Sequence, residues 1–188
     1  MSAFDLKVAL MQYYRFRRGW VCVYEFHGAD IIVDTEKEII EVETKITKHD
    51  LIEGERKKHN KHQRYKDGIG SYYLRPNRFL FCVPEKLVDD ALGWAKEINE
   101  NYGVIAFNTE RFKKHLLENK LYWHAHNCYL RTARSAKKLH DNYKETASCR
   151  IAKRASSALA NLMEYTHTKS LQEALIPVEQ AKEQSDGN

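Results

Sequence analysis

Apolar side chains near the start of the chain recur at helical spacing, and the pattern then changes to that of strands. Phe4, Val8 and Met11 fall on one stripe, which predicts a helix over residues 4–17 that Gly19 ends. Aromatic and β-branched residues then dominate three segments: 20–26, 29–34 and 38–47. Only two or three turn residues separate these segments, so we predict an antiparallel meander of three strands.

Helical and strand patterns alternate after the meander. Two short apolar runs read as buried strands, at 78–83 and 104–107. The predicted helices cover 48–66, 85–101, 109–118, 130–146 and 148–166. Strands interleaved with single helices predict an α/β fold, a mixed β-sheet flanked by helices, with a helical C-terminal extension. We divide the chain into an α/β core at 1–120, a helical extension packed on it at 121–175, and a polar, disordered tail at 176–188.

Composition places the chain among globular proteins. Hydrophobic residues make up 43% of its 188 residues, and no apolar run approaches the roughly 20 residues that span a bilayer, so we expect no membrane partner. The N-terminal segment lacks the pattern of a secretory signal. Four widely spaced cysteines form no CxxC pair and are typical of reduced thiols. Together these features predict a cytoplasmic protein.

Charge is unevenly distributed along the chain. Residues 44–66 hold eight Lys or Arg against three Asp or Glu, and residues 130–169 hold nine against three. With a net charge of +5 overall, the rest of the chain is therefore acidic. Such segregation favours a basic face that meets a polyanion, although two solvated helix surfaces would give the same count.

The third predicted strand carries the candidate chemistry. Alternate side chains share a face of a strand, so Glu41, Glu43 and Lys45 point one way. Asp30 opens the neighbouring strand, and a short turn between the two strands would bring it near Glu43 and Lys45. Charged groups at such a position are costly to bury unless they are used or solvated. The alternative is an exposed sheet face with cross-strand ion pairs.

This set of residues matches what phosphodiester hydrolysis requires. Mg²⁺, or Mn²⁺ in its place, prefers carboxylate and water ligands, which Asp30 and Glu43 would supply. Such an ion polarises the phosphate and activates water, and Lys45 would stabilise the developing charge. An ExK tripeptide alone is weak evidence, whereas an aspartate opening one strand and ExK on the next is a much stronger signal.

Several motifs follow one another in a characteristic order along residues 1–107. They are Glu25, Ala29-Asp30, the strand Glu41-Val42-Glu43-Thr44-Lys45, Thr47-Lys48-His49-Asp50, Lys61-His62-Gln63-Arg64-Tyr65, and the segments RFLFCVPEKL and YGVIAF. In these motifs the chain resembles the PD-(D/E)XK nuclease superfamily, in particular MmcB-like DNA-repair proteins. The resemblance implies a restriction-endonuclease-like fold and metal-dependent cleavage of DNA. Two departures are Ala29 where the motif often has proline, and a long segment from Asp67 to Arg78.

Other residues extend the candidate site. Glu25 ends the first strand and is either a further catalytic metal ligand or a plain exposed carboxylate. Phosphate contacts are predicted for four residues of the basic helix, with a solvated face as the alternative: Lys58, Lys61, His62 and Arg64. Arg75 follows Tyr72 and Tyr73 on a glycine-flanked loop that is suited to binding a nucleic-acid end.

Two later segments leave their roles open. The aromatic and histidine-rich segment 122–126 is more typical of packing than of metal ligation. The basic helices predicted within 130–166 would either widen a DNA-contacting surface or form a homo-oligomer contact. We therefore expect a Mg²⁺- or Mn²⁺-dependent DNA endonuclease or repair nuclease. The alternatives are a non-catalytic nucleic-acid-binding or complex-forming module that keeps the nuclease fold, and a scaffold without a nucleic-acid role.

Overall fold

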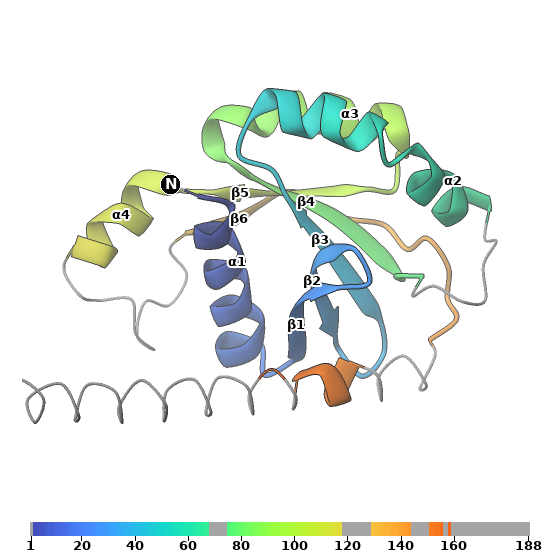
Figure 1. Cartoon of the computed structure of the whole chain (residues 1–188), viewed down its shortest axis with the longest axis horizontal. Coiled ribbons are helices and arrows are strands. Elements are labelled where there is room, and N and C mark those ends of the chain that lie inside the picture. The colour runs from blue at the N-terminus through green and yellow to red at the C-terminus, as the bar shows by residue number, and fades with distance from the viewer. Residues whose placement is uncertain (1, 68–74, 118–128, 144–150, 156–157, 159–188) are drawn as a thin grey trace, which may run out of the picture. The chain divides into compact units, whose positions relative to one another are not determined.

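The protein is built on a mixed six-stranded β-sheet whose strands lie in the order β1-β2-β3-β4-β5-β6 (Figure 1). The structure is a computed structural model and describes residues 2–67, 75–117, 129–143, 151–155 and 158. β1, β2 and β3 form the antiparallel meander, β3, β4 and β5 run parallel, and β6 is antiparallel to β5. The α/β class with a mixed sheet and flanking helices, predicted from the sequence, is thus confirmed.

The order of elements follows the sequence pattern closely up to residue 117. The strands are β1 Val21–Phe26, β2 Ala29–Asp34, β3 Ile39–Thr44, β4 Arg78–Pro84, β5 Gly103–Phe107 and β6 Leu130–Arg134. The helices are α1 Ala3–Gln12, the π-helix η1 Tyr13–Arg17, the π-helix η2 Asp50–Gly54, α2 His59–Asp67, the 3₁₀-helix η3 Glu85–Leu87, α3 Val88–Ile98 and α4 Thr109–Leu117.

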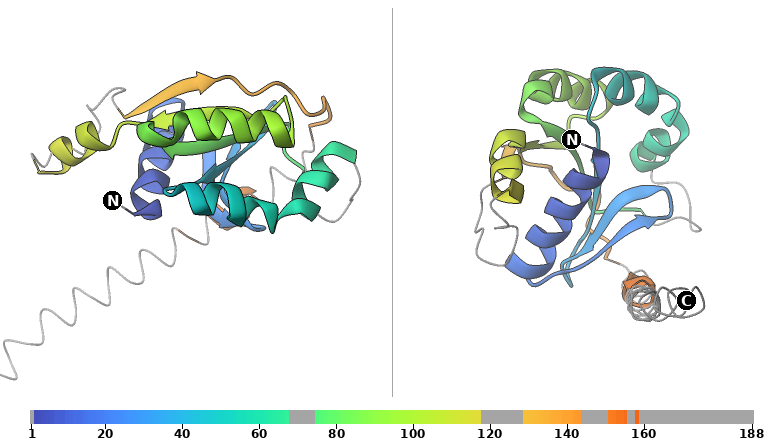
Figure 2. Two further views of the ribbon diagram at one scale, coloured as in Figure 1. Left: turned by 90° about the horizontal axis from the view of Figure 1, so that it is seen from above. Right: turned by 60° about the vertical axis from the view of Figure 1, so that its left-hand side comes forward.

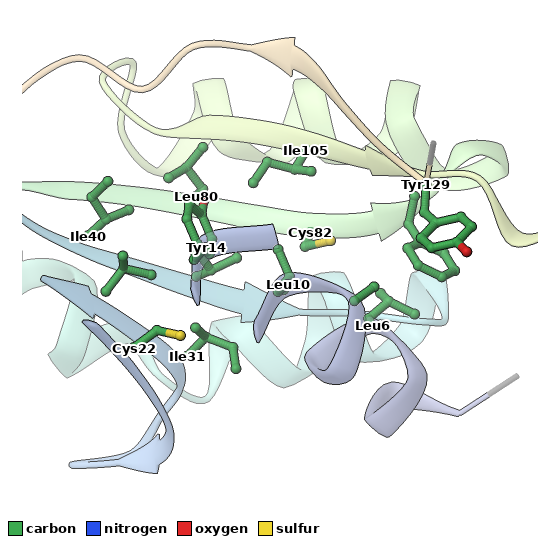
Figure 3. Close-up of a cluster of buried hydrophobic side chains, with 14 of the residues drawn as sticks. Leu6, Leu10, Tyr14, Cys22, Ile31, Ile40, Leu80, Cys82, Ile105 and Tyr129 are labelled. Atoms are coloured by element: carbon green, nitrogen blue, oxygen red, sulfur yellow. The ribbon is translucent and has the colours of Figure 1, made fainter. Parts of the chain in front are cut away.

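Two apolar cores lie on opposite faces of the sheet. Leu6 and Leu10 of α1 and Tyr14 of η1 pack onto strand residues of one face, among them Ile31 and Cys82 (Figure 3). Helices α2 and α3 cover the other face, over a second core. This core contains the aromatic and apolar residues Tyr65, Phe79, Phe81, Trp94, Tyr102 and Val104. The sheet is therefore the middle of three layers, as the two views in Figure 2 show.

The first hairpin has a sequence suited to its turn. Phe26 pairs with Ala29, so only His27 and Gly28 connect β1 to β2. Both residues have positive φ, 52° and 78°, as a two-residue turn that follows the strand twist requires. Glycine adopts this conformation without a steric penalty. The tight turn fixes the register that places Asp30 at the start of β2.

The basic helix predicted over 48–66 is interrupted. Residues Asp50–Gly54 form a single π-helical turn, and the regular helix α2 begins only at His59. A Cβ on Gly54 would lie 2.6 Å from the Asp50 carboxylate oxygen, so a larger residue there would require the Asp50 side chain to move. Short π-helical segments are frequent at functional sites, and this one lies directly after the strand that carries Glu43 and Lys45.

The helix predicted over 130–146 is wrong, because Leu130–Arg134 form the edge strand β6. Leucine, alanine and arginine favour a helix locally, but pairing with the free edge of β5 overrides this preference. Gly103 makes the approach possible, since a Cβ on it would lie 2.6 Å from the backbone nitrogen of Ala136. The compact unit that contains the sheet runs to Ile151.

The remaining residues belong to a second unit, Ala152–Asn188, of which the structure describes only 152–155 and 158. Residues 151–155 are helical, within the helix predicted over 148–166. The tail predicted at 176–188, the segment 122–126, and Tyr72 and Tyr73 lie outside the described residues. In the part of the chain that the structure describes, no helix has the length and apolar character to cross a membrane.

Candidate functional site

Strand β3 turns its charged side chains toward the face covered by α2 and α3. Ile40 and Val42 belong to the core under α1, so Glu41 and Glu43 project to the opposite face, as the two-residue strand period predicts. Both glutamates are 1% exposed, and Lys45, which follows β3, is 4% exposed. Three charged residues are thus buried beside an aromatic core, where each requires a partner.

Lysine side chains supply the partners of Glu43. Lys58 Nζ lies 2.8 Å from Glu43 Oε2, and Lys61 Nζ binds Glu43 Oε1. Lys61 also binds Glu41, and the β1–β2 turn lies close, with the Gly28 carbonyl oxygen 3.5 Å from Lys61 Nζ. Burial alone would lower the pKa of Lys61, but Glu41 and Glu43 raise it above its usual value. Both lysines therefore hold their charge against the carboxylates.

Glu55, just after η2, is the partner of Lys45. Lys45 Nζ lies 2.7 Å from Glu55 Oε1, against 3.8 Å from Glu43 Oε2. Glu55 also contacts Lys58 at 3.2 Å and His62 Nε2 at 2.8 Å. Burial works to raise the pKa of Glu55, but the hydrogen bond from His62 and the lysine charges outweigh it and lower the pKa to about 2. Glu55 is therefore a carboxylate at any physiological pH.

Glu41 is as fully buried as Glu43 and Glu55. Its Oε2 accepts a hydrogen bond of 2.5 Å from the hydroxyl of Tyr65, a residue of α2. Burial raises the pKa of Glu41, and Lys61 offsets only part of that effect. The residues Glu41, Glu43, Glu55, Lys45, Lys58 and Lys61 together form a group that we call the charge cluster. It pairs three acidic with three basic side chains.

Asp30 lies at the edge of this group, beside the end of β3. Its Oδ2 accepts hydrogen bonds from the backbone nitrogen of Thr44 at 2.7 Å and from the Thr44 hydroxyl at 2.8 Å. Its Oδ1 lies 2.9 Å from Lys7 Nζ, and the side chain is 23% exposed. Burial would raise the pKa of Asp30, but Thr44 and Lys7 hold it below its usual value. The Asp30 carboxylate thus contacts Thr44, the residue between Glu43 and Lys45 in the chain.

Glu25 stands on the solvent side of Asp30. It is 64% exposed and shares Lys7 with Asp30, with a distance of 3.1 Å between Lys7 Nζ and Glu25 Oε1. Its φ of 50° is unusual for a non-glycine residue within a strand. Glu25 therefore lies within the neighbourhood of Asp30 but points its carboxylate at an ammonium group of α1.

The basic residues predicted to contact phosphate occupy different environments. Lys58 and Lys61 point at the glutamates, and His62 is buried, with Nδ1 2.9 Å from the Tyr102 hydroxyl. Arg64 donates from Nε to the carbonyl oxygen of Asn60 at 2.9 Å on the exposed side of α2. Arg75 donates to the carbonyl oxygen of Tyr65 at 3.0 Å. His62 consequently supports Glu55 from within, whereas the lysines and Arg64 lie nearer the surface.

Sequence reasoning missed Glu55 and Lys7. Glu55 follows a glycine in a strongly charged segment, so it reads as a surface residue. A signal for it was present: Glu55 precedes Lys58 by three residues and His62 by seven, which is the spacing of one helix face. Lys7 had no such signal, because only the packing of α1 against β2 brings it to Asp30.

The donor set can be compared with the needs of a divalent cation. Among the described residues, no three His, Cys, Asp or Glu side chains gather in a group that could hold a metal ion. Mg²⁺ does not require such a group, since it keeps several waters and is often bound through one or two carboxylates and substrate phosphates. Asp30 and Glu43 offer two carboxylates from neighbouring strands. The ammonium group of Lys7 neutralises Asp30, and that of Lys58 neutralises Glu43. A Mg²⁺ or Mn²⁺ ion at these two carboxylates would therefore have to displace lysine or threonine contacts and draw its remaining ligands from water.

Comparison with known proteins supports the fold. No model of a known protein family matches the chain, and no curated protein sequence is significantly similar to it. A solved structure, described as "SPO1766 protein of unknown function from Silicibacter pomeroyi", is similar over 87% of this chain and 90% of its own. The two share 13% identity and superpose with a TM-score of 0.54, a likeness that shows the fold alone.

Proposed function

We propose that this protein is a divalent-metal-dependent nuclease that hydrolyses phosphodiester bonds in DNA. The observation that carries the proposal is the charge cluster beside Asp30. Removing a charged group from water costs several kcal/mol, and apolar residues of similar volume are often at least as stabilising. A fold that retains six charged side chains in one place, with shifted pKa values, is best explained by a function.

Some residues of the site would contact the cation or the substrate, and others position the side chains of the first group. Asp30 and Glu43 would bind the cation, which when bound polarises a phosphate oxygen and activates water. Lys45 keeps an ammonium group at the end of β3, where it would stabilise charge that develops on the phosphate. Glu55 fixes that ammonium group at 2.7 Å, and His62 fixes Glu55. The Lys58 side chain is 36% exposed, so its ammonium group would be accessible to a phosphate of the substrate.

A non-catalytic nucleic-acid-binding or complex-forming module is the second candidate. Both carboxylate oxygens of Glu43 are occupied by lysines, and no group of three metal-ligating side chains forms within the described residues. A protein with this arrangement that has no cation site would bind phosphate without cutting it. The two candidates differ in their dependence on divalent metal.

Parallel cleavage and binding measurements separate the candidates. Fluorescent linear, single-stranded and branched DNA, together with supercoiled plasmid, would be incubated with Mg²⁺ or Mn²⁺ and with EDTA. Fluorescence anisotropy in EDTA measures binding without cleavage. Glu43→Gln removes the charge of the proposed ligand. Glu53→Gln is its matched control, because Glu53 is a half-exposed glutamate of η2 that pairs with Arg56 on the surface.

The nuclease proposal predicts cutting that needs metal, disappears in Glu43→Gln and persists in Glu53→Gln. Binding in EDTA without any cutting by folded protein would favour the non-catalytic module. Cutting that Glu43→Gln retains at the wild-type rate would show that activity resides elsewhere or in a contaminant.

A further inference from the structure

A second basic surface lies at the far end of the first hairpin from Asp30. It consists of three arginines and three aromatic residues in and after η1: Arg15, Arg17, Arg18, Tyr13, Phe16 and Trp20. We call it the arginine surface. Val21, the first residue of β1, pairs with Asp34, the last residue of β2, whereas Asp30 lies near the start of β2. At about 3.3 Å per strand residue, the four residues from Asp34 to Asp30 correspond to roughly 13 Å along the hairpin.

Aromatic rings hold two of the guanidinium groups in place. The Cζ atoms of Arg17 and Arg18 lie 5.7 and 5.4 Å from the centre of the Tyr13 ring, and Arg18 lies 5.5 Å from that of Trp20. Arg18 Nε also donates to the Tyr13 hydroxyl at 3.0 Å. Cation–π contacts of this kind order side chains that would otherwise move freely, so less entropy is lost when they bind a ligand.

The positive charge of this surface is not balanced by its surroundings. Within the described part of the chain, no carboxylate lies within salt-bridge distance of the three guanidinium groups. Glu38, in the turn between β2 and β3, forms ion pairs with Arg78 at 2.6 Å and with Lys138 at 3.2 Å. Asp34 is buried and accepts a hydrogen bond from Tyr143. The surface therefore presents a net positive charge to a partner.

Apolar exposure accompanies that charge. Phe16 is 61% exposed and Val21, at the start of the edge strand, is 37% exposed. Tyr13 and Trp20 pack partly against the core, whereas the Phe16 ring is exposed. Arginine beside an exposed aromatic ring is a composition that binds single-stranded nucleic acid, where phosphates meet the cations and bases stack on the ring. An anionic membrane attracts similar residues, but it is bound by amphipathic helices through a free apolar face, and the helical stretch that ends in η1 already buries Leu6, Leu10 and Tyr14 in the core of the sheet.

We propose that the arginine surface binds a single-stranded segment of nucleic acid next to the charge cluster. The inference rests on the proposed nucleic-acid role but not on catalysis. An oligonucleotide that spans both sites gains affinity from each.

The test measures binding in EDTA, so that loss of cleavage does not enter. Anisotropy of a labelled single-stranded 20-mer is followed over a series of KCl concentrations for the triple variant Arg15→Gln/Arg17→Gln/Arg18→Gln. Three lost phosphate contacts reduce the slope of log K against log[salt] by about 2 for a single strand. We expect at least a tenfold loss of affinity at 50 mM KCl. Phe16→Ala is expected to weaken the single strand about fivefold and a duplex less than twofold.

A charge-matched variant controls for general electrostatics. Lys86→Gln/Lys96→Gln/Lys137→Gln also removes three exposed positive charges, from η3, α3 and the segment after β6. It is expected to retain affinity within about threefold, and thermal unfolding verifies that every variant is folded. Equal losses in both triple variants would overturn the inference while leaving the nuclease proposal intact. Wild-type protein that binds phosphatidylserine vesicles but no oligonucleotide would overturn it in favour of a membrane, and would remove the nucleic-acid role as well.

Discussion

Replacing Glu55 by glutamine tests how the charge cluster is held together. The substitution keeps the volume of the side chain and can keep the contact with His62, but it removes the charge that faces Lys45. Lys45 is 4% exposed and would be left with Glu43 at 3.8 Å and Asp50 at 3.7 Å as its nearest carboxylates. Breaking a buried ion pair by removing one partner typically costs about 3–5 kcal/mol.

The pKa of Glu55 gives an independent magnitude. Its folded-state pKa of about 2 lies below the ordinary value of 4.5. A depressed pKa contributes stability that is present above the unfolded-state pKa and is lost as pH falls toward the folded-state pKa. The difference corresponds to about 3 kcal/mol of unfolding free energy, with about two thirds lost by pH 3. Both approaches therefore predict that Glu55→Gln costs about 3 kcal/mol at pH 7.

Urea unfolding followed by tryptophan fluorescence measures this free energy at pH 7 and at pH 3. We expect the gap between wild type and Glu55→Gln to shrink to about 1 kcal/mol at pH 3, because only the wild type loses the Glu55 contribution. Glu53→Gln, which breaks an exposed pair with Arg56, is expected to change stability by less than about 1 kcal/mol at either pH. A gap that is the same at both pH values, or below about 1 kcal/mol at pH 7, would refute the reasoning.

Three further changes test other parts of the structure. Tyr65→Phe leaves the buried Glu41 Oε2 without its hydroxyl donor and is expected to cost about 1–3 kcal/mol in urea unfolding; no measurable loss would place water there instead. Asn77→Ala removes the side-chain oxygen that accepts a hydrogen bond from the Ile39 backbone nitrogen, and is likewise expected to cost about 1–3 kcal/mol of unfolding free energy. A thermal midpoint equal to that of wild type would contradict a stabilising role for this hydrogen bond. Lys7→Met removes a group that lowers the pKa of Asp30, so the acidic limb of the cleavage–pH profile should move to higher pH; an unchanged limb would separate Asp30 from catalysis.

Local patterns sufficed for most of the fold. The three strands of the meander and the strands at 78 and 103 carry β-branched and aromatic residues between clear turn signals, so their positions could be predicted within a few residues. The edge strand β6 could not, because its sequence favours a helix and its conformation is set by pairing with β5. Within the helix predicted over 48–66, Gly54 is the only residue that disfavours a helix strongly, and it does not mark the start of α2 at His59.

The candidate site shows the same division. The two-residue period of a strand was enough to place Glu41, Glu43 and Lys45 on one face. The lysines and Glu55 that neutralise them come from the irregular segment after β3, and their orientation depends on tertiary packing. Lysines predicted to face a ligand instead point at the glutamates in the free protein, because buried carboxylates compete strongly for nearby cations.

The rate of plasmid nicking in Mg²⁺ by wild type, Glu43→Gln and Glu53→Gln, measured side by side on folded protein, tests the central claim most directly. We predict that Glu43→Gln is slower by about 100-fold or more, a loss of about 3 kcal/mol of transition-state stabilisation, while Glu53→Gln keeps the wild-type rate and EDTA stops both. Equal rates for the two variants, or no nicking by folded wild-type protein with any divalent metal, would contradict the account.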